Sequence, residues 1–293
     1  MFQKAITITT VTQRIKQIKQ PRGGYLPIQN FNVDVLPTDK TISPWQDHGV
    51  SPQTTGLVVQ YLTLRVLDAS IETVDIFAIP IRGYQTQLLI SGSCPDVLSQ
   101  MINTIDSCRD ISEITNDVII STYNLCRYEK AYRSKVILSG DSSMPSLCYF
   151  DDVREMVRRS VSFFQTLGPL VYHEFTIAGA PPSQYIQKGD GDFVTKTALI
   201  DMKVISRNPT PEMTLQQLCY WIFCSLSKDV EKRKLFQHLH ELILFNPRKN
   251  IAYRIHIADI SIDCIKQVAN EVIGWDIKVV NTGGSCPELK WIG

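Results

Sequence analysis

The sequence has no excess of charge of one sign, no long apolar run and no close pair of cysteines. Its 293 residues carry a formal net charge of +1, so no overall field favours a polyanion, and any nucleic-acid contact must come from local clustering. No apolar stretch approaches the length of a membrane span, and residues 1–10 lack a signal-peptide apolar core. We therefore expect a cytoplasmic protein with no membrane partner.

The eight cysteines include no Cys-x-x-Cys pair, and most lie inside apolar or helical segments. We expect reduced, mostly buried thiols, because a disulfide framework or a zinc site would need closer spacing. The sequence also has no Ser-His-Asp set, no P-loop and no zinc-ligand spacing. Apolar residues make up 44% of the chain and charged residues 20%, which is typical of a globular protein with a sizeable core.

The chain changes character at a turn-rich stretch, Ser139–Pro145, which we predict to be a linker. Residues 1–145 are predicted to form a mainly helical region of unassigned role, and residues 146–293 a second domain. The first 24 residues carry five basic side chains and no acidic one, and these are Lys4, Arg14, Lys16, Lys19 and Arg22. Such a segment fits a solvated surface or a basic arm on a phosphate backbone equally well.

The second half alternates between helical and strand patterns. The expected elements are a helix over 151–167, a strand over 170–177, a hairpin turning at 195–197, helices over 212–226 and 229–244, a strand over 251–257 and a helix over 260–273. The order predicts an α/β (α+β) fold in which helices flank a central sheet.

The chemistry is concentrated in the hairpin. Asp201 and Lys203 are two residues apart on a predicted strand, so they share one face, and the turn brings Asp192 near them. Two carboxylates and a lysine can hold Mg²⁺ and activate a water for attack on phosphate. A surface ion pair would be the simplest alternative, but the rest of this strand is apolar, and a charge pair in a buried strand favours a metal site.

Three motifs resemble the PD-(D/E)XK nuclease superfamily. They are the first acidic motif Gly189-Asp-Gly-Asp192, the (D/E)-x-K motif Asp201-Met202-Lys203, and the Gln-x-x-x-Tyr signature Gln216–Tyr220 of the RecB-like branch. Gln217 and Trp221 have the same spacing one register further along. The resemblance covers residues 150–275 and implies a restriction-endonuclease-like core, a mixed central sheet flanked by helices, preceded here by a mainly helical N-terminal region.

The resemblance also implies a role for each motif residue. Asp192, Asp201 and the Met202 carbonyl would bind Mg²⁺ or Mn²⁺. Lys203 would orient or help to deprotonate the attacking water, and Gln216 and Tyr220 would position a phosphate or the lysine. One more carboxylate is expected in such a site: Glu155 on the first helix is the preferred residue, and Glu174 in the following strand is the alternative.

The implied activity is that of a Mg²⁺-dependent DNA endonuclease in restriction or anti-phage defence, with DNA favoured over RNA. Basic residues on or near the core that could follow a phosphate backbone are Arg154, Arg158, Arg159, Lys188 and Lys196. The alternatives are an RNA- or tRNA-directed nuclease, and a catalytically silent nucleic-acid-binding protein or complex subunit. A homo-oligomer or a partner subunit in a defence complex is compatible with either activity.

Overall fold

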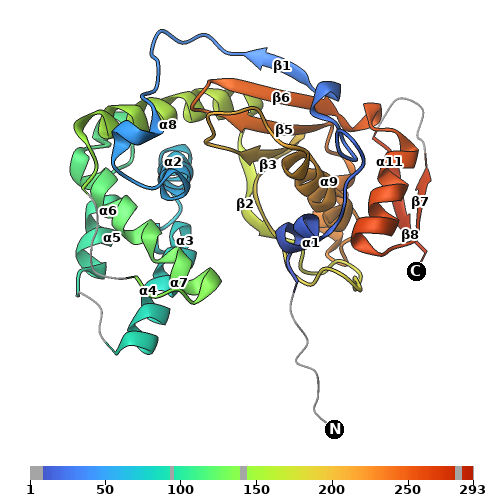
Figure 1. The fold of residues 1–293 in the computed structure, drawn as a ribbon, viewed down its shortest axis with the longest axis horizontal. Helices are drawn as coiled ribbons and strands as arrows, with labels where there is room; N and C mark the ends of the chain where they lie inside the picture. The colour runs from blue at the N-terminus through green and yellow to red at the C-terminus, as the bar shows by residue number, and fades with distance from the viewer. Residues whose placement is uncertain (1–8, 93–95, 139–143, 281–285, 293) are drawn as a thin grey trace.

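The computed structural model describes residues 9–92, 96–138, 144–280 and 286–292. A group of helices stands beside a layered sheet domain, and one long helix joins the two (Figure 1). Lys4 and most of the predicted linker at 139–145 lie outside the described residues. Within the described part of the chain, none of the helices combines the length and the apolar character that a membrane span requires.

The helical group comprises α2 (Pro52–Leu67), α3 (Thr73–Ile76), α4 (Ala78–Ser91), α5 (Leu98–Asp106), α6 (Asn116–Arg127) and α7 (Glu129–Ser134). Helix α2 begins where the side chain of Ser51 accepts the Thr54 N–H and Pro52 occupies the first turn. The mainly helical character expected of this region therefore holds for residues 52–134.

Helix α8 (Leu147–Leu167) connects the helical group to the sheet domain. Its predicted apolar face is buried along its whole length, through Val153, Met156, Val157, Val161 and Phe164. Towards the helical group it packs on α2, and towards the sheet Phe163 stacks on Phe245 with ring centroids 4.1 Å apart. The two parts of the molecule therefore share a continuous apolar core.

The main sheet has six strands in the order β1–β6–β5–β4–β3–β2. They are β1 (Asn32–Val35), β2 (Leu170–Thr176), β3 (Asp190–Thr195), β4 (Ala198–Met202), β5 (Glu241–Asn246) and β6 (Ile251–His256). Only the β4–β5 pair is parallel. A separate small ribbon joins β7 (Ile277–Val280) and β8 (Glu288–Trp291). The predicted mixed α/β class is confirmed.

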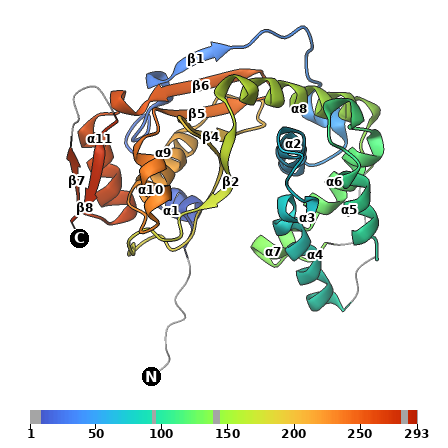
Figure 2. The same ribbon diagram turned by 180° about the vertical axis from the view of Figure 1, so that it is seen from behind.

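Helices cover both faces of the sheet, as Figures 1 and 2 show from opposite sides. Helices α8 and α2 pack on one face. On the other lie α1 (Val11–Gln17), α9 (Pro211–Ser225), α10 (Val230–Gln237) and α11 (Ile262–Gln267), which continues as a π-helix over Val268–Ile273. The central strands β4 and β5 are buried on both sides, which is why they read as nearly continuous apolar runs.

The predicted helix over 229–244 is wrong in its second half. Helix α10 ends at Gln237, and residues 241–246 form β5, which lies between β4 and β6. Leu242 to Phe245 are at most 1% exposed, so this segment carries no polar–apolar alternation to mark it as a strand.

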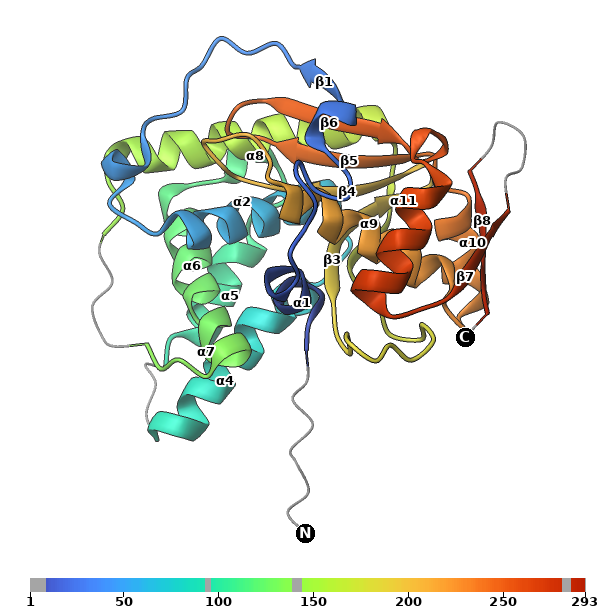
Figure 3. The same cartoon turned by 45° about the vertical axis from the view of Figure 1, so that its right-hand side comes forward.

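Residues 9–35 differ from the predicted domain organisation. Helix α1 packs on α9, the N–H of Val11 donates to the Lys188 carbonyl at 2.9 Å, and β1 pairs with β6 (Figure 3). Residues 9–35 therefore belong to the sheet domain, and a boundary between 145 and 146 does not separate the two parts. The expected basic arm is part of this fold: Arg14 donates to the carbonyls of Glu271 and Val272.

Candidate functional site

Asp192 and Asp201 lie side by side on neighbouring strands. Phe193 pairs with Ile200 in the β3–β4 ladder, so one further step along this register places Asp192 opposite Asp201 on the face covered by α9. The Asp192 Oδ2 accepts the N–H of Met202 at 2.9 Å, and the Lys203 Nζ lies 2.9 Å from the Asp201 Oδ2. The hairpin therefore brings together the three polar side chains that the sequence singled out.

The Asp201 carboxylate is poorly satisfied for a buried acid. It is 4% exposed, and its Oδ2, although ion-paired with Lys203, takes no hydrogen bond of good geometry. Burial raises the pKa of Asp201 to about 7; the Lys203 charge opposes this rise and the Asp192 charge adds to it. Burial works against the charge on Lys203, but Asp201 and Asp192 outweigh it and raise the lysine pKa. The site thus holds more negative charge than its lysine balances.

Helix α9 brings Tyr220 near the aspartates, and Gln216 lies beside Tyr220 and Thr12. The Gln216 Nε2 donates to the Tyr220 hydroxyl at 2.9 Å, and burial followed by the charges of the aspartates raises the pKa of Tyr220. The alternative register has a structural role, because Gln217 donates to the Leu199 and Ile243 carbonyls at 2.9 and 2.7 Å, inside the core. Trp221 likewise donates to a backbone carbonyl and is completely buried.

Two glycines around the first acidic motif allow close packing of aromatic rings. A Cβ on Gly191 would lie 2.1 Å from the ring of Phe175, and a Cβ on Gly189 would lie 3.0 Å from the ring of Tyr220. Larger residues would push these rings away. The glycines therefore keep Tyr220 close to the strand that carries Asp192.

Glu174 is the further carboxylate that the structure brings to Asp192. The β2–β3 register places it opposite Asp192, but its positive φ of 50° turns the side chain out of the regular alternation, towards α2. There it lies close to Tyr61. Burial raises the pKa of Glu174 to about 7; the neighbouring Tyr61 hydroxyl lowers it, and the charges of Glu129 and Asp192 raise it further.

Glu155, the preferred sequence prediction for this role, is held elsewhere. Its carboxylate accepts hydrogen bonds from Arg158 at 2.7 and 2.9 Å and from Arg159 at 2.7 Å. Burial works against its charge, but these two arginines outweigh it and lower the pKa of Glu155. Glu155 is thus ion-paired with arginines three and four residues further along the same helix. Neither Asp192 nor Asp201 belongs to this cluster.

The helical group adds three residues to the edge of the site that sequence patterns did not reveal. The Tyr61 hydroxyl on α2 donates to Glu129 on α7 at 3.1 Å. Arg133 donates to Glu129 and reaches across to Asp190 at 3.3 Å. No spacing in the sequence points to these contacts, because the residues come from two helices far from the motif. They join the helical group to the acidic strand ends.

Most of the basic residues predicted to contact nucleic acid are bound to other groups of the protein. Arg154 donates to the Ile114 carbonyl, Arg158 pairs with Glu155, and Arg159 is 3% exposed. Lys196 is exposed, but at the turn of the hairpin, roughly 16 Å along the strand from Asp201 at the usual rise per residue. Lys188 is exposed and lies two residues before Asp190, so it is the one of the five near the carboxylates.

A second group of possible metal ligands lies near the start of α8. The donor atoms of His48, Cys148 and Asp152 are within 4.8 Å of one another, and the His48 Nε2 is 2.9 Å from the Asp152 Oδ2. Nitrogen, sulfur and oxygen donors suit a softer ion than Mg²⁺. The sequence shows no zinc spacing here because His48 is about 100 positions from the other two.

The raised pKa of Asp201 leads us to expect that the stability of the fold depends on pH. The folded pKa of Asp201, about 7, exceeds its ordinary value of 3.8, so folding is favoured by the protonated carboxyl at low pH, and this contribution is lost as the pH rises through 7. We expect the unfolding free energy in chelator to fall more between pH 5.5 and 8 for the wild type than for Asp201→Asn. Urea titrations with EDTA measure this difference, and equal pH dependence in both proteins would contradict it.

Comparisons with protein-family models, with curated proteins and with solved structures find no match to this chain.

Proposed function

We propose that this protein hydrolyses phosphodiester bonds of nucleic acid, as a nuclease dependent on Mg²⁺ or Mn²⁺. One observation carries the proposal: Asp192 and Asp201 face each other on adjacent strands, and Lys203 lies 2.9 Å from Asp201. A buried ion pair seldom stabilises a fold relative to apolar residues, so it is weak evidence for a purely structural role. Perturbed carboxyl groups gathered at one end of a sheet are more typical of a functional site.

The donor set fits a hard divalent cation. Carboxylate and carbonyl oxygens are the ligands that Mg²⁺ takes from proteins, and Asp192, Asp201 and the Met202 carbonyl are the proposed ones. The Asp201 Oδ2 is buried without a hydrogen bond of good geometry, and a cation would satisfy it. When bound, the ion would offset charge on a phosphate oxygen and lower the pKa of a water.

The remaining residues would act on the phosphate and the water. The Lys203 ammonium can donate a hydrogen bond to a phosphate oxygen, or hold the attacking water, while it remains paired with Asp201. Tyr220, already bonded by Gln216, offers a hydroxyl beside the carboxylates. Glu174 is the proposed third acid in place of Glu155, because the charge of Asp192 acts on it and its pKa of about 7 suits proton transfer near neutral pH.

The arrangement of elements also supports the proposal. Helix α8, strand β2, the β3–β4 hairpin and helices α9 and α10 follow one another in the order that the sequence pattern predicts and that resembles PD-(D/E)XK nucleases, whereas β5 replaces the second half of a predicted helix. DNA remains the preferred substrate over RNA. Restriction or anti-phage defence, and a dimer or partner subunit, are proposed from that resemblance alone.

A cleavage assay tests the proposed function. Supercoiled plasmid, single-stranded DNA and tRNA are each incubated with the protein in Mg²⁺, Mn²⁺ or EDTA. We expect metal-dependent cleavage, with plasmid DNA cut, and none in EDTA. Cleavage of RNA alone would move the proposal to an RNA-directed nuclease. Binding to any of these without cleavage in either metal would favour the silent binding protein.

A further inference from the structure

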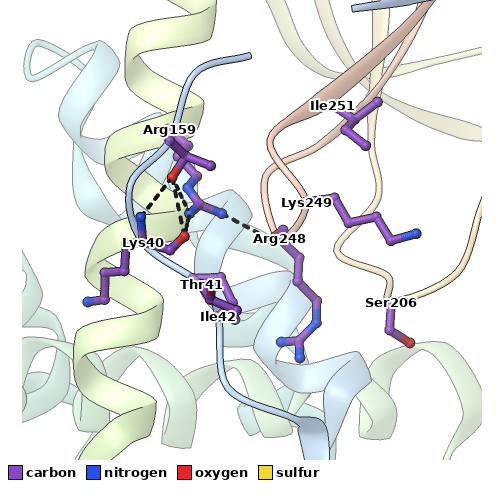
Figure 4. Close-up of a pocket in the computed structure, with 9 residues that line it drawn as sticks. Lys40, Thr41, Ile42, Arg159, Ser206, Arg248, Lys249 and Ile251 are labelled. Atoms are coloured by element: carbon purple, nitrogen blue, oxygen red, sulfur yellow. Dashed lines mark hydrogen bonds between the residues drawn. The ribbon is translucent and has the colours of Figure 1, made fainter. Parts of the chain in front are cut away.

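A basic pocket lies on the opposite face of the sheet, between the segment 38–42 and the turn that follows β5 (Figure 4). Its volume is about 370 Å³, large enough for a nucleotide. Four of its lining residues are cationic and none is acidic; the cations are Lys40, Arg159, Arg248 and Lys249. Such a surface excludes cationic ligands and favours an anion.

Arg248 is the side chain in this pocket with an unmet hydrogen-bonding need. It is 9% exposed, its Nη1 has no hydrogen-bond partner, and its Nη2 donates to the Ser43 carbonyl. The guanidinium stacks over the ring of Trp45, 4.0 Å from the centroid, which fixes its plane. Burial lowers the pKa of Arg248, and the nearby charge of Asp152 only partly opposes this. Buried donors without partners are uncommon, so Arg248 carries unmet hydrogen-bonding capacity in the wall of the pocket.

The other cationic side chains of the pocket differ in how many hydrogen bonds they already make to the protein. Arg159 is saturated by Glu155 and by backbone carbonyls. Lys40 donates to the Asp151 carbonyl at 3.0 Å, and its amine points away from the other side chains of the pocket (Figure 4). Among the residues that the structure describes, Lys249 donates to the amide oxygen of Asn208, at 3.3 Å. Arg248 and Lys249, with the Ser206 hydroxyl across from them, are therefore the groups available to a ligand.

The pocket lies at the same end of the sheet as the carboxylates. The turn that carries Arg248 follows β5 directly, β5 is parallel to β4, and the N–H of Lys203 donates to the Phe245 carbonyl at 2.8 Å. Ser206 is three residues beyond Lys203. The phosphate backbone of a nucleic-acid strand that passes the end of β4 could therefore reach the pocket.

We propose that this pocket binds a phosphate group through Arg248 and Lys249. Phosphate offers several acceptor oxygens with a full charge, which match the planar guanidinium of Arg248 and the ammonium of Lys249, both in the pocket lining. The group can belong to a free nucleotide or to the backbone of a bound strand. The binding requires neither the metal nor cleavage, so it stands independently of the proposed nuclease activity.

Binding measured in EDTA tests the phosphate site. Inorganic phosphate and adenosine 5′-monophosphate are titrated by calorimetry, and a fluorescein-labelled single-stranded oligonucleotide by fluorescence anisotropy. The variants are Arg248→Met, which keeps the stem of the side chain, and Lys249→Gln, which removes a partly exposed charge and preserves the fold. Lys266→Gln, an exposed lysine of α11, is the matched control. We expect saturable binding by wild type, weakened about tenfold by Arg248→Met and severalfold by Lys249→Gln.

The probes distinguish the two sources of phosphate. Loss of affinity for the mononucleotide with oligonucleotide binding unchanged would identify a nucleotide site. Weaker oligonucleotide binding, with inorganic phosphate competing in the wild type, would identify a subsite for the strand. If Arg248→Met fails to fold, Lys249→Gln decides. Wild-type affinity of Lys249→Gln for all three probes, or no phosphate binding by the wild type, would overturn the proposal.

Discussion

Replacing Asp201 by Asn or Lys203 by Met is expected to slow metal-dependent cleavage by orders of magnitude while the protein stays folded. Each substitution removes a charge that the proposed site uses to stabilise the transition state, and such contributions amount to several kcal/mol. Because each 1.36 kcal/mol is a factor of ten in rate, we expect cleavage to slow by about 10²- to 10³-fold. Initial rates on supercoiled plasmid under saturating Mg²⁺ give the comparison.

Two controls separate chemistry from folding and from general charge effects. Asp259→Asn and Lys278→Met make the same chemical changes at exposed positions outside the site, and both should cut like the wild type. Circular dichroism and the melting temperature establish that the inactive variants are folded. Cleavage at the wild-type rate by either Asp201→Asn or Lys203→Met would reject the proposed catalytic role of these residues.

The second large effect is expected at Arg159, where the fold depends on a buried cation. Its guanidinium binds Glu155 at 2.7 Å, the carbonyls of Pro247 and Arg248 at 3.0 and 2.9 Å, and Thr38 at 2.6 Å. It thereby fastens α8, the β5–β6 turn and the segment before α2. Arg159→Met leaves a buried carboxylate and several carbonyls without this partner, and we expect a loss of about 3–5 kcal/mol in the free energy of unfolding.

Arg158→Met is the matched control, because Arg158 binds the same Glu155 carboxylate from a side chain that is 46% exposed. An exposed ion pair contributes about 0–1 kcal/mol, so this variant should unfold close to the wild-type midpoint. Urea titrations followed by tryptophan fluorescence measure both variants. Equal stability of the two variants would show that burial of Arg159 adds nothing to its contacts.

The hairpin could be predicted because its information is local. The turn residues, the apolar run and the spacing of Asp201 and Lys203 all lie within a short segment, and strand geometry alone sets which side chains share a face. Helical periodicity likewise places Gln216 and Tyr220 on one side of α9. These predictions needed only the neighbouring residues.

The features that the sequence did not predict depend on contacts between segments that are distant along the chain. Strand β5 is buried on both faces, so its apolar run resembles the end of a helix. Strand β1 is exposed over all four residues and joins the sheet only through its pairing with β6. The left-handed backbone of Glu174, which turns its carboxyl towards Tyr61, has no sequence signal, since non-glycine residues rarely adopt that conformation. Glu155 had the right helical position but was already bound by two arginines.

The most direct test is to locate the metal. Crystals grown or soaked in Mn²⁺ give an anomalous difference map that marks the ion independently of any activity. The account predicts a peak within bonding distance of carboxylate oxygens of both Asp192 and Asp201, and its loss in Asp201→Asn. A well-diffracting wild-type crystal with Mn²⁺ at the His48–Cys148–Asp152 group and none between the two aspartates would contradict it.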